Sequence, residues 1–406
     1  MDTSSPSTVR PWSADAPDAP SRVTTAGAWL LMAVGGAAQV SIALAQTLLA
    51  AALVCWVLSA VRERSRPSLP AFCWPLLGYA AWTLVSALAS PEPRVSLVDC
   101  KQLLLFLIVP ATLHLVRGRQ ADTARHLVVT VGAAAALYGI FQYGLLHYDR
   151  LSQRPQGTLG HYMTYSGILM LGIGAALAQL LFSTKERLWP ALLLPALLLG
   201  VALTSTRMAW VGVCAASALL LVMKDFRLLA ALPLAGAITF AAAGPSITHR
   251  LMSMFDANDP TRRDRVAMVI EGARMVRDHP LTGVGPNRIE RVYPQYRIAS
   301  AVEAVNPHLH NVPMQIAAER GLPALALWLG FVATLTAQLW QRLRTVGTRA
   351  RSAAALAAVA GMLAAGLFEY NFGDSEFLML FLLLVTLPFC SQDPEETGDT
   401  TPRSHA

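Results

Sequence analysis

Arg207 and its neighbours have the residue types of an anion-binding site. The arginine follows the hydroxyl-rich run Thr204-Ser205-Thr206 and begins a predicted apolar helix. A cation at a helix N-terminus opposes the helix dipole, so a bound phosphate or carboxylate would compensate it. Guanidinium and hydroxyl groups also bind such anions directly. The alternative is an arginine that extends to a polar interface without binding a ligand.

Two further arginines are candidates for the same task. Arg265 ends the charged run at 262–265, and apolar residues recur at helical spacing from there to Asp278-His279-Pro280. Arg154 lies in a polar segment between two apolar ones. For an arginine in a loop rich in arginine, simple solvation is the alternative explanation, so Arg265 carries weight only together with the other residues.

His310 is the candidate proton acceptor. The run Asn306-Pro307-His308-Leu309-His310 predicts an Asn N-cap, a proline at the first helical position and a helix that continues to Arg320. His310 would lie near the first turn, where the helix dipole disfavours the imidazolium form. A neutral histidine accepts a proton near pH 7 and can act as a general base. A capping or surface histidine is the alternative.

The elements that must position these groups are membrane helices. Of the 406 residues, 54% are hydrophobic and 14% are charged, whereas soluble domains carry about 25% charged residues. This composition excludes a soluble enzyme. The net charge of +7 comes from arginines in loops between apolar runs, a pattern that encodes membrane topology and excludes nucleic-acid binding. The cysteines have no disulfide or zinc spacing.

Apolar segments as long as a membrane-spanning helix follow one another along the chain. We predict an all-α integral membrane protein with about twelve transmembrane helices. A tight turn at 38–41 separates the first two. The predicted spans cover roughly 26–61 (two spans), 69–90, 99–116, 123–146, 161–182, 188–203, 208–223, 228–243, 322–340, 353–370 and 376–389.

The distribution of lysine and arginine predicts the orientation. Basic residues collect in the even-numbered connections, which places these connections and both termini in the cytoplasm. All four candidates, Arg154, Arg207, Arg265 and His310, then lie on the outer side. The predicted divisions are a disordered cytoplasmic tail (1–23), nine spans (24–243), a long outer loop with amphipathic helices (244–306), a short outer helix and three spans (307–392) and a second cytoplasmic tail (393–406).

These residues resemble the O-antigen ligase and polymerase family of bacterial envelope glycosyltransferases. His310-Asn311, nine further residues and Gly321 are similar to the ligase signature, from which Ala324 is a mild departure. The run 204–207 looks like the family's approach to an essential arginine. Arg265 with the glycine turn at 279–285 looks like its outer-loop motif, and the segment 369–376 is also similar.

The resemblance implies a GT-C-like architecture and a step of lipopolysaccharide biosynthesis. A finished O-antigen would pass from undecaprenyl diphosphate to a sugar hydroxyl of lipid A-core, on the periplasmic face of the bacterial inner membrane. His310 would be the catalytic base, and Asn311 and Asp264 would orient the histidine and Arg265. Three arginines would bind the diphosphate: Arg154, Arg207 and Arg265. The reaction would invert the anomeric centre.

No metal or cofactor is expected. Arginines can stabilise a leaving diphosphate, and the predicted outer loops contain no paired carboxylates of the kind that hold Mg²⁺. An O-antigen polymerase or a protein O-oligosaccharyltransferase would use the same donor, although the His310 signature favours the ligase. A transporter or flippase is a more distant alternative, because the predicted helix centres contain few ionisable residues.

Overall fold

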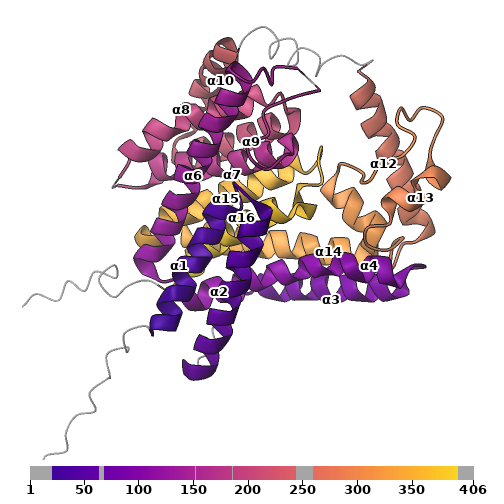
Figure 1. Cartoon of the computed structure of the whole chain (residues 1–406), viewed down its shortest axis with the longest axis horizontal. Helices are drawn as coiled ribbons and strands as arrows, with labels where there is room; N and C mark the ends of the chain where they lie inside the picture. The colour runs from indigo at the N-terminus through magenta and orange to yellow at the C-terminus, as the bar shows by residue number, and fades with distance from the viewer. Residues whose placement is uncertain (1–20, 64–67, 151, 185, 244–258, 392–406) are drawn as a thin grey trace, which may run out of the picture.

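The structure is a computed structural model that describes residues 21–63, 68–150, 152–184, 186–243 and 259–391. Within these ranges every regular element is a helix, as Figure 1 shows. The all-α prediction is therefore confirmed for this part of the chain. Most of both predicted tails, and the first part of the predicted outer loop at 244–258, lie outside the described residues.

Helices joined by short connections make up both halves of the chain. The elements before residue 244 are α1 (Arg22–Ala37), α2 (Ile42–Glu63), α3 (Cys73–Ala89), α4 (Pro93–Asp99), η1 (Cys100–Leu107), α5 (Ile108–Leu115), α6 (Gly118–Gly144), α7 (Tyr162–Phe182), α8 (Leu188–Leu203), α9 (Arg207–Lys224), η2 (Phe226–Ala230) and α10 (Ala231–Ala243). Those after it are α12 (Pro260–Asp278), α13 (Ile289–Tyr296), α14 (Val312–Arg342), η4 (Val346–Thr348), α15 (Arg349–Ala365), η5 (Asn371–Gly373), α16 (Ser375–Thr386) and η6 (Leu387–Phe389).

Six of these helical segments are long and apolar enough to cross a membrane. They are α2, the continuous segment Pro93–Leu115, α6, α7, α9 and α14. Four shorter apolar helices accompany them: Cys73–Ala89, Leu188–Leu203, Phe226–Ile238 and Ser375–Phe389. This content is that of a multi-pass membrane protein. Each predicted span overlaps a helix, whereas the number of twelve crossings stays a prediction.

Small residues let the central helices approach closely. An added Cβ at Gly174 of α7 would lie 3.2 Å from the Cβ of Ala357 in α15, and one at Gly212 of α9 would lie 3.1 Å from the carbonyl oxygen of Gly361. Close contact through small side chains is a common way for membrane helices to associate. The packing of α15 against α7 and α9 places the end of α15 beside the starts of the other two helices.

The segment before α14 differs from its prediction. The expected helix start at Asn306 and Pro307 is wrong, because α14 begins at Val312 with Asn311 as its N-cap. The Asn311 side chain accepts from the backbone N–H of Met314 at 2.9 Å. Asn306 is instead buried five residues earlier, where its side-chain amide nitrogen donates to the Tyr293 hydroxyl at 2.9 Å. His310 therefore lies in the turn before the helix and not within its first turn.

Two other local predictions are confirmed. The apolar pattern after Arg265 does form a helix, α12, which ends at Asp278. Gly321 breaks the regular course of α14, with φ 79° and ψ 172°. In Figure 1, α12 and α13 lie at one end of the molecule, close to the ends of α3 and α4. The start of α14 packs against α12 and brings the segment containing His310 to the same end.

Candidate functional site

A cavity of about 610 Å³ brings together most of the residues singled out in the sequence. Its walls come from the N-terminal ends of α7 and α9, one face of α12, the turn before α14 and the segment after α15. The predicted residues that line it are Arg154, Arg207, Arg265, His310 and Asn311. Asp264 is buried on α12 and is not among the lining residues.

His310 is held by a carboxylate from a distant part of the chain. Its backbone has φ 48°, which is uncommon for a residue with a side chain. Nδ1 of His310 lies 2.8 Å from Oε2 of Glu369, whose side chain is only 6% exposed. Burial lowers the pKa of His310, although the negative charge of Glu369 acts in the opposite direction.

Glu369 fixes the tautomer of His310. Burial opposes ionisation of this carboxyl group, but the hydrogen bonds from His308 and His310 outweigh it and lower the pKa of Glu369. An ionised carboxylate can only accept hydrogen bonds, so His310 donates to it from Nδ1. The other ring nitrogen, Nε2, is then the one able to accept a proton.

His308 completes a group of three potential metal ligands. Its Nε2 lies 2.9 Å from Oε1 of Glu369, and the ligand atoms of His308, His310 and Glu369 all lie within 4.8 Å of one another. The sequence predicts no metal site, so this group of ligand types was not expected. Distances of 2.8 and 2.9 Å are those of direct hydrogen bonds, and a zinc ion at about 2.0–2.2 Å from each ligand would require the groups to separate. The geometry fits a histidine–carboxylate cluster better than a metal centre.

Arg265 connects α12 to both segments of the histidine–carboxylate pair. Its guanidinium donates to the carbonyl oxygen of His310 at 3.3 Å and to that of Phe368. It also lies 4.0 Å from Oε2 of Glu369. Burial lowers the pKa of Arg265 while Glu369 raises it, and a guanidinium keeps its charge in proteins in any case. The side chain therefore contributes a fixed positive charge beside the pair.

Arg207 begins α9, as predicted, and has an acidic partner. The preceding Ser205 has φ 53°, which turns the chain sharply between α8 and α9. Nη2 of Arg207 lies 2.8 Å from Oδ2 of Asp259, the N-cap of α12, and this hydrogen bond lowers the pKa of Asp259 to about 2. The compensating anion expected at this helix end is thus present as a side chain. This ion pair also joins the start of α9 to the start of α12.

Arg154 packs on an aromatic ring in the same cavity. Its guanidinium carbon lies 4.2 Å from the ring centroid of Tyr162, the first residue of α7. Burial lowers the pKa of Arg154, and the nearby charge of Arg207 adds to the effect. Two like charges that are held near each other favour an anion between them. The cavity thus combines one histidine with four lining arginines, since Arg262 lines it beside the three predicted ones.

Asp264 and Asn311, the two expected supporting residues, form hydrogen bonds with backbone groups. Asp264 accepts hydrogen bonds from the N–H groups of Val302 and Glu303 at 3.0 and 3.1 Å and so anchors the chain that leads to His308. Asn311 caps α14 and donates from its amide to the carbonyl oxygen of Leu367 at 3.1 Å. Asn311 thereby joins the segment containing His310 to the one containing Glu369.

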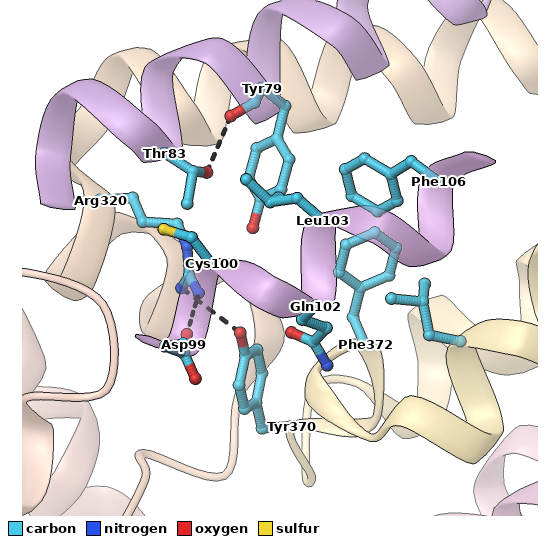
Figure 2. A pocket seen from close by; sticks show the side chains of 11 residues that line it. Tyr79, Thr83, Asp99, Cys100, Gln102, Leu103, Phe106, Arg320, Tyr370 and Phe372 are labelled. Atoms are coloured by element: carbon cyan, nitrogen blue, oxygen red, sulfur yellow. Dashed lines mark hydrogen bonds and ion pairs between the residues drawn. The ribbon is translucent and has the colours of Figure 1, made fainter. Parts of the chain in front are cut away.

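A second polar cluster lies next to the chain segment that carries Glu369. We call Asp99, Glu319, Arg320 and Tyr370 the Arg320 cluster, which Figure 2 shows except for Glu319. Arg320 is 3.3 Å from Oδ2 of Asp99 and 3.4 Å from the Tyr370 hydroxyl, and it also contacts the Glu319 carboxylate. Tyr370 directly follows Glu369 in the chain, so the cluster fixes the backbone beside the partner of His310.

The glycines of the predicted motifs allow two backbones to meet. Gly283 has φ 65°, and an added Cβ would lie 2.3 Å from the carbonyl carbon of Glu319. Gly321 has φ 79°, and its Cβ would lie 1.9 Å from the carbonyl oxygen of Leu281. Side chains would fit at neither position. The glycine turn therefore docks the segment after α12 onto α14 and does not contact the cavity.

Sequence reasoning missed three members of the site. Glu369 was noted only as part of a similar segment, and nothing in its surroundings links it to a histidine 59 positions earlier. His308 and Asp259 were not singled out at all. For Asp259 a signal was present, because Asp259-Pro260 is a typical N-cap and first position of a helix.

Comparison with known proteins gives one match. The family described as O-antigen ligase matches residues 192–329, a segment that includes Arg207, Arg265, His310 and Gly321. A search of curated proteins found no match. The match covers less than half of the chain and shows that this segment is similar to the O-antigen ligase family.

Proposed function

We propose that this chain transfers O-antigen from undecaprenyl diphosphate to a sugar hydroxyl of lipid A-core, and the match of residues 192–329 to the O-antigen ligase family supports this proposal. The observation that carries the proposal is the pair of His310 and Glu369 beside a cavity lined by four arginines. A base and a cationic surface in one cavity are what glycosyl transfer from a diphosphate requires. The product would be complete lipopolysaccharide.

His310 acts on the acceptor. Its Nε2 removes the proton of the acceptor hydroxyl as the oxygen attacks the anomeric carbon of the donor glycan. The bond between that carbon and the diphosphate oxygen breaks, and undecaprenyl diphosphate leaves with the electron pair. A single direct attack inverts the configuration at the anomeric carbon. Glu369 holds the imidazole in the productive tautomer and stabilises the imidazolium that forms.

The arginines act on the leaving group. Arg207, Arg265 and Arg154 offer guanidinium groups to the diphosphate as its negative charge grows. Such stabilisation replaces the divalent cation that many enzymes use with diphosphates, so the proposed reaction is metal-independent. Binding of the donor would also compete with Asp259 for Arg207, which makes this ion pair the contact that donor binding rearranges.

The proposed location is the inner membrane, with the cavity open to the periplasm and both termini in the cytoplasm. Two observations support this orientation. Residues of predicted outer connections meet in the cavity, whereas Arg351 and Asp122, from two predicted inner connections, form an ion pair at 2.9 Å elsewhere. The alternation of basic connections assigns the second group to the cytoplasm.

Deletion of the gene from its host tests the proposed reaction. Electrophoresis of the envelope glycolipids should then show lipid A-core without polymer, while the polymer accumulates on undecaprenyl diphosphate. Reintroduction of the unaltered gene should restore the full ladder. Restoration of the same ladder by the His310→Ala variant, at an equal amount of protein in the membrane, would refute the proposed role of the histidine.

The same gel separates the related reactions. Loss of an O-antigen polymerase would leave single repeat units attached to the core, and that result would refute the ligase assignment. Loss of a protein O-oligosaccharyltransferase would leave lipopolysaccharide unchanged and remove glycan from a protein. Loss of a flippase would keep the lipid-linked glycan inaccessible to periplasmic enzymes.

A further inference from the structure

A second cavity, of about 240 Å³, lies beside the first and differs from it in chemistry. It is an elongated groove between α7, α8, α9 and α10, and we call it the apolar groove. All of its lining residues are uncharged, and nearly all are aliphatic. The indole N–H of Trp210 is already bound to the carbonyl oxygen of Val201 at 3.3 Å. The apolar groove therefore suits a hydrocarbon ligand.

The apolar groove and the polar cavity meet at the turn between α8 and α9. Val201 and Ala202, at the end of α8, line the groove, whereas Ser205 and Arg207, a few residues later, line the polar cavity. The first turns of α9 show the same division, because Trp210 faces the groove and Val211 faces the cavity. One short turn of the chain thus separates a hydrocarbon site from an anion site.

The apolar groove extends away from the polar cavity along α9. Its residues on this helix run from Trp210 to Leu221, a rise of about 16 Å at 1.5 Å per residue. The antiparallel helix α8 contributes residues from Ala202 back to Leu194 along the same course. The length and direction suit a chain that starts at Arg207 and passes into the membrane.

We infer that the apolar groove binds the polyprenyl chain of the lipid-linked donor next to the diphosphate site. This inference rests on the proposed function, because it assigns the second half of the same substrate. A polyprenyl diphosphate carries its anionic group directly at the end of a long hydrocarbon chain, and the two cavities present the complementary surfaces in that order. Burial of each methylene contributes about 0.8 kcal/mol, so the groove adds affinity for long-chain donors.

Two positions allow the apolar groove to be filled without disturbing the polar cavity. Cys214 lines the groove and is exposed, so a Cys214→Trp change places an indole in it. Gly236 lines the opposite wall, and an added Cβ there meets no atom within 4 Å. Gly236→Leu therefore adds bulk without a clash. The matched control is Leu234→Trp, because Leu234 is an exposed residue of α10 outside the groove lining.

The experiment compares donor chain lengths on the purified full-length protein in lipid nanodiscs. One donor carries the glycan on undecaprenyl diphosphate, and the other carries it on a short geranyl diphosphate. Each groove-filling variant should lower kcat/KM for the long donor roughly tenfold, equivalent to the loss of about two buried methylenes. Transfer from the short donor, and all transfer by the Leu234→Trp variant, should stay unchanged.

Three results would overturn the inference. Equal kcat/KM for the long donor in the groove-filling variants and the unaltered protein would show that the chain lies elsewhere. Equal losses for both donors would also refute it, because a site for the hydrocarbon chain must distinguish the long donor from the short one. The third result concerns labelling by a photoreactive undecaprenyl phosphate. This probe should label peptides of α8, α9 and α10 and lose this labelling in Cys214→Trp, and a failure to label these peptides would overturn the inference. If a phospholipid with the same photoreactive group competed equally, the groove would be a general lipid site.

The labelling arm separates this inference from the proposed function. Photolabelling requires no transfer of glycan, so it works on a protein that uses another acceptor or performs another reaction. If the unaltered protein transferred no glycan from either donor yet was labelled in the apolar groove, the proposed function would fail and the lipid site would stand. If transfer took place but no label reached the apolar groove, the proposed function would stand and the lipid site would fail.

Discussion

The cavity and the Arg320 cluster contain the same kinds of side chain and differ in the space they enclose. Each has arginine beside a buried carboxylate. In the cavity, His310, Arg154 and Arg207 border about 610 Å³ of open volume. Around Arg320 the free space is about 10 Å³, and the guanidinium is surrounded by its protein partners (Figure 2).

The difference separates a group that can act on a ligand from a group that shapes the fold. Arg320 is 3% exposed and bonded to three side chains from different segments of the chain. Breaking a buried pair leaves an uncompensated charge and destabilises the protein. An arginine that borders open volume can instead exchange its partner for a substrate. Substitutions in the cavity should therefore lower the rate of transfer, whereas substitutions in the Arg320 cluster should lower the stability of the fold.

Apart from removal of His310 itself, the largest effect on transfer is expected from Glu369→Gln. A glutamine amide that donates to Nδ1 of His310 favours the wrong tautomer, in which Nε2 carries the proton, and loss of a comparable carboxylate costs about 10³–10⁴ in rate. The measurement is the initial rate of glycan transfer by purified protein. Glu376→Gln, in the first turn of α16, is the matched control and should be close to unaltered. A loss below tenfold in Glu369→Gln would contradict the pairing of His310 with Glu369.

Arg320→Leu should act on stability. Removal of the guanidinium leaves Glu319 buried without its partner, at a cost of about 3–5 kcal/mol. Thermal unfolding of the purified protein in detergent should show a clearly lower midpoint. Arg277→Leu is the control, because Arg277 is 75% exposed and its surface ion pair is worth about 0–1 kcal/mol. Equal unfolding midpoints for Arg320→Leu and Arg277→Leu would contradict the proposed role of the Arg320 cluster in stabilising the fold.

Arg207→Gln should keep the fold and lose activity. One cationic group that stabilises developing charge contributes about 10²–10³ in rate, and the remaining arginines of the cavity keep part of the binding. Unfolding temperature and transfer rate are measured on the same preparation. Arg207→Lys should recover part of the rate, because it keeps the charge but not the paired geometry. Loss of folding in Arg207→Gln would show that Arg207, like Arg320, mainly stabilises the fold.

The smallest expected effect is on the pH dependence of transfer. His310 must be neutral to accept a proton, and burial keeps its pKa below the ordinary value. Activity should rise with pH and level off below pH 7, with an apparent pKa under about 6.5 and a change smaller than about threefold between pH 6 and 7. An acid limb centred above pH 7 would show that a different group limits the reaction.

The helices and the positions of the cavity arginines could be predicted because their signals are local. Long apolar runs define α7 and α9, and the turn before Arg207 is visible as three consecutive hydroxyl residues. The start of α14 was misplaced because two asparagines precede prolines or apolar runs. Asn311 is the residue that caps the helix, whereas the side chain of Asn306 contacts Tyr293 and Asp264, and these contacts cannot be seen from sequence spacing.

Long-range partners were the part that sequence could not provide. Glu369 reaches His310 only because α15 ends beside the start of α14, where the backbone N–H of Val312 donates to the carbonyl oxygen of Gly366 at 2.7 Å. The glycine motifs could be seen in the sequence, but the structural reason for glycine at these positions could not. Gly283 and Gly321 are small because each faces the backbone of the other's segment.

The most direct test of the account is single-turnover transfer by purified full-length protein with His310 replaced by alanine. The assay contains lipid-linked donor, lipid A-core and an excess of a metal chelator. The account predicts full transfer by the unaltered protein and a rate lower by about 10²–10⁴ for His310→Ala, with donor binding retained. Normal transfer by His310→Ala, or no transfer by the unaltered protein until a metal is added, would contradict a reaction driven by the His310–Glu369 pair.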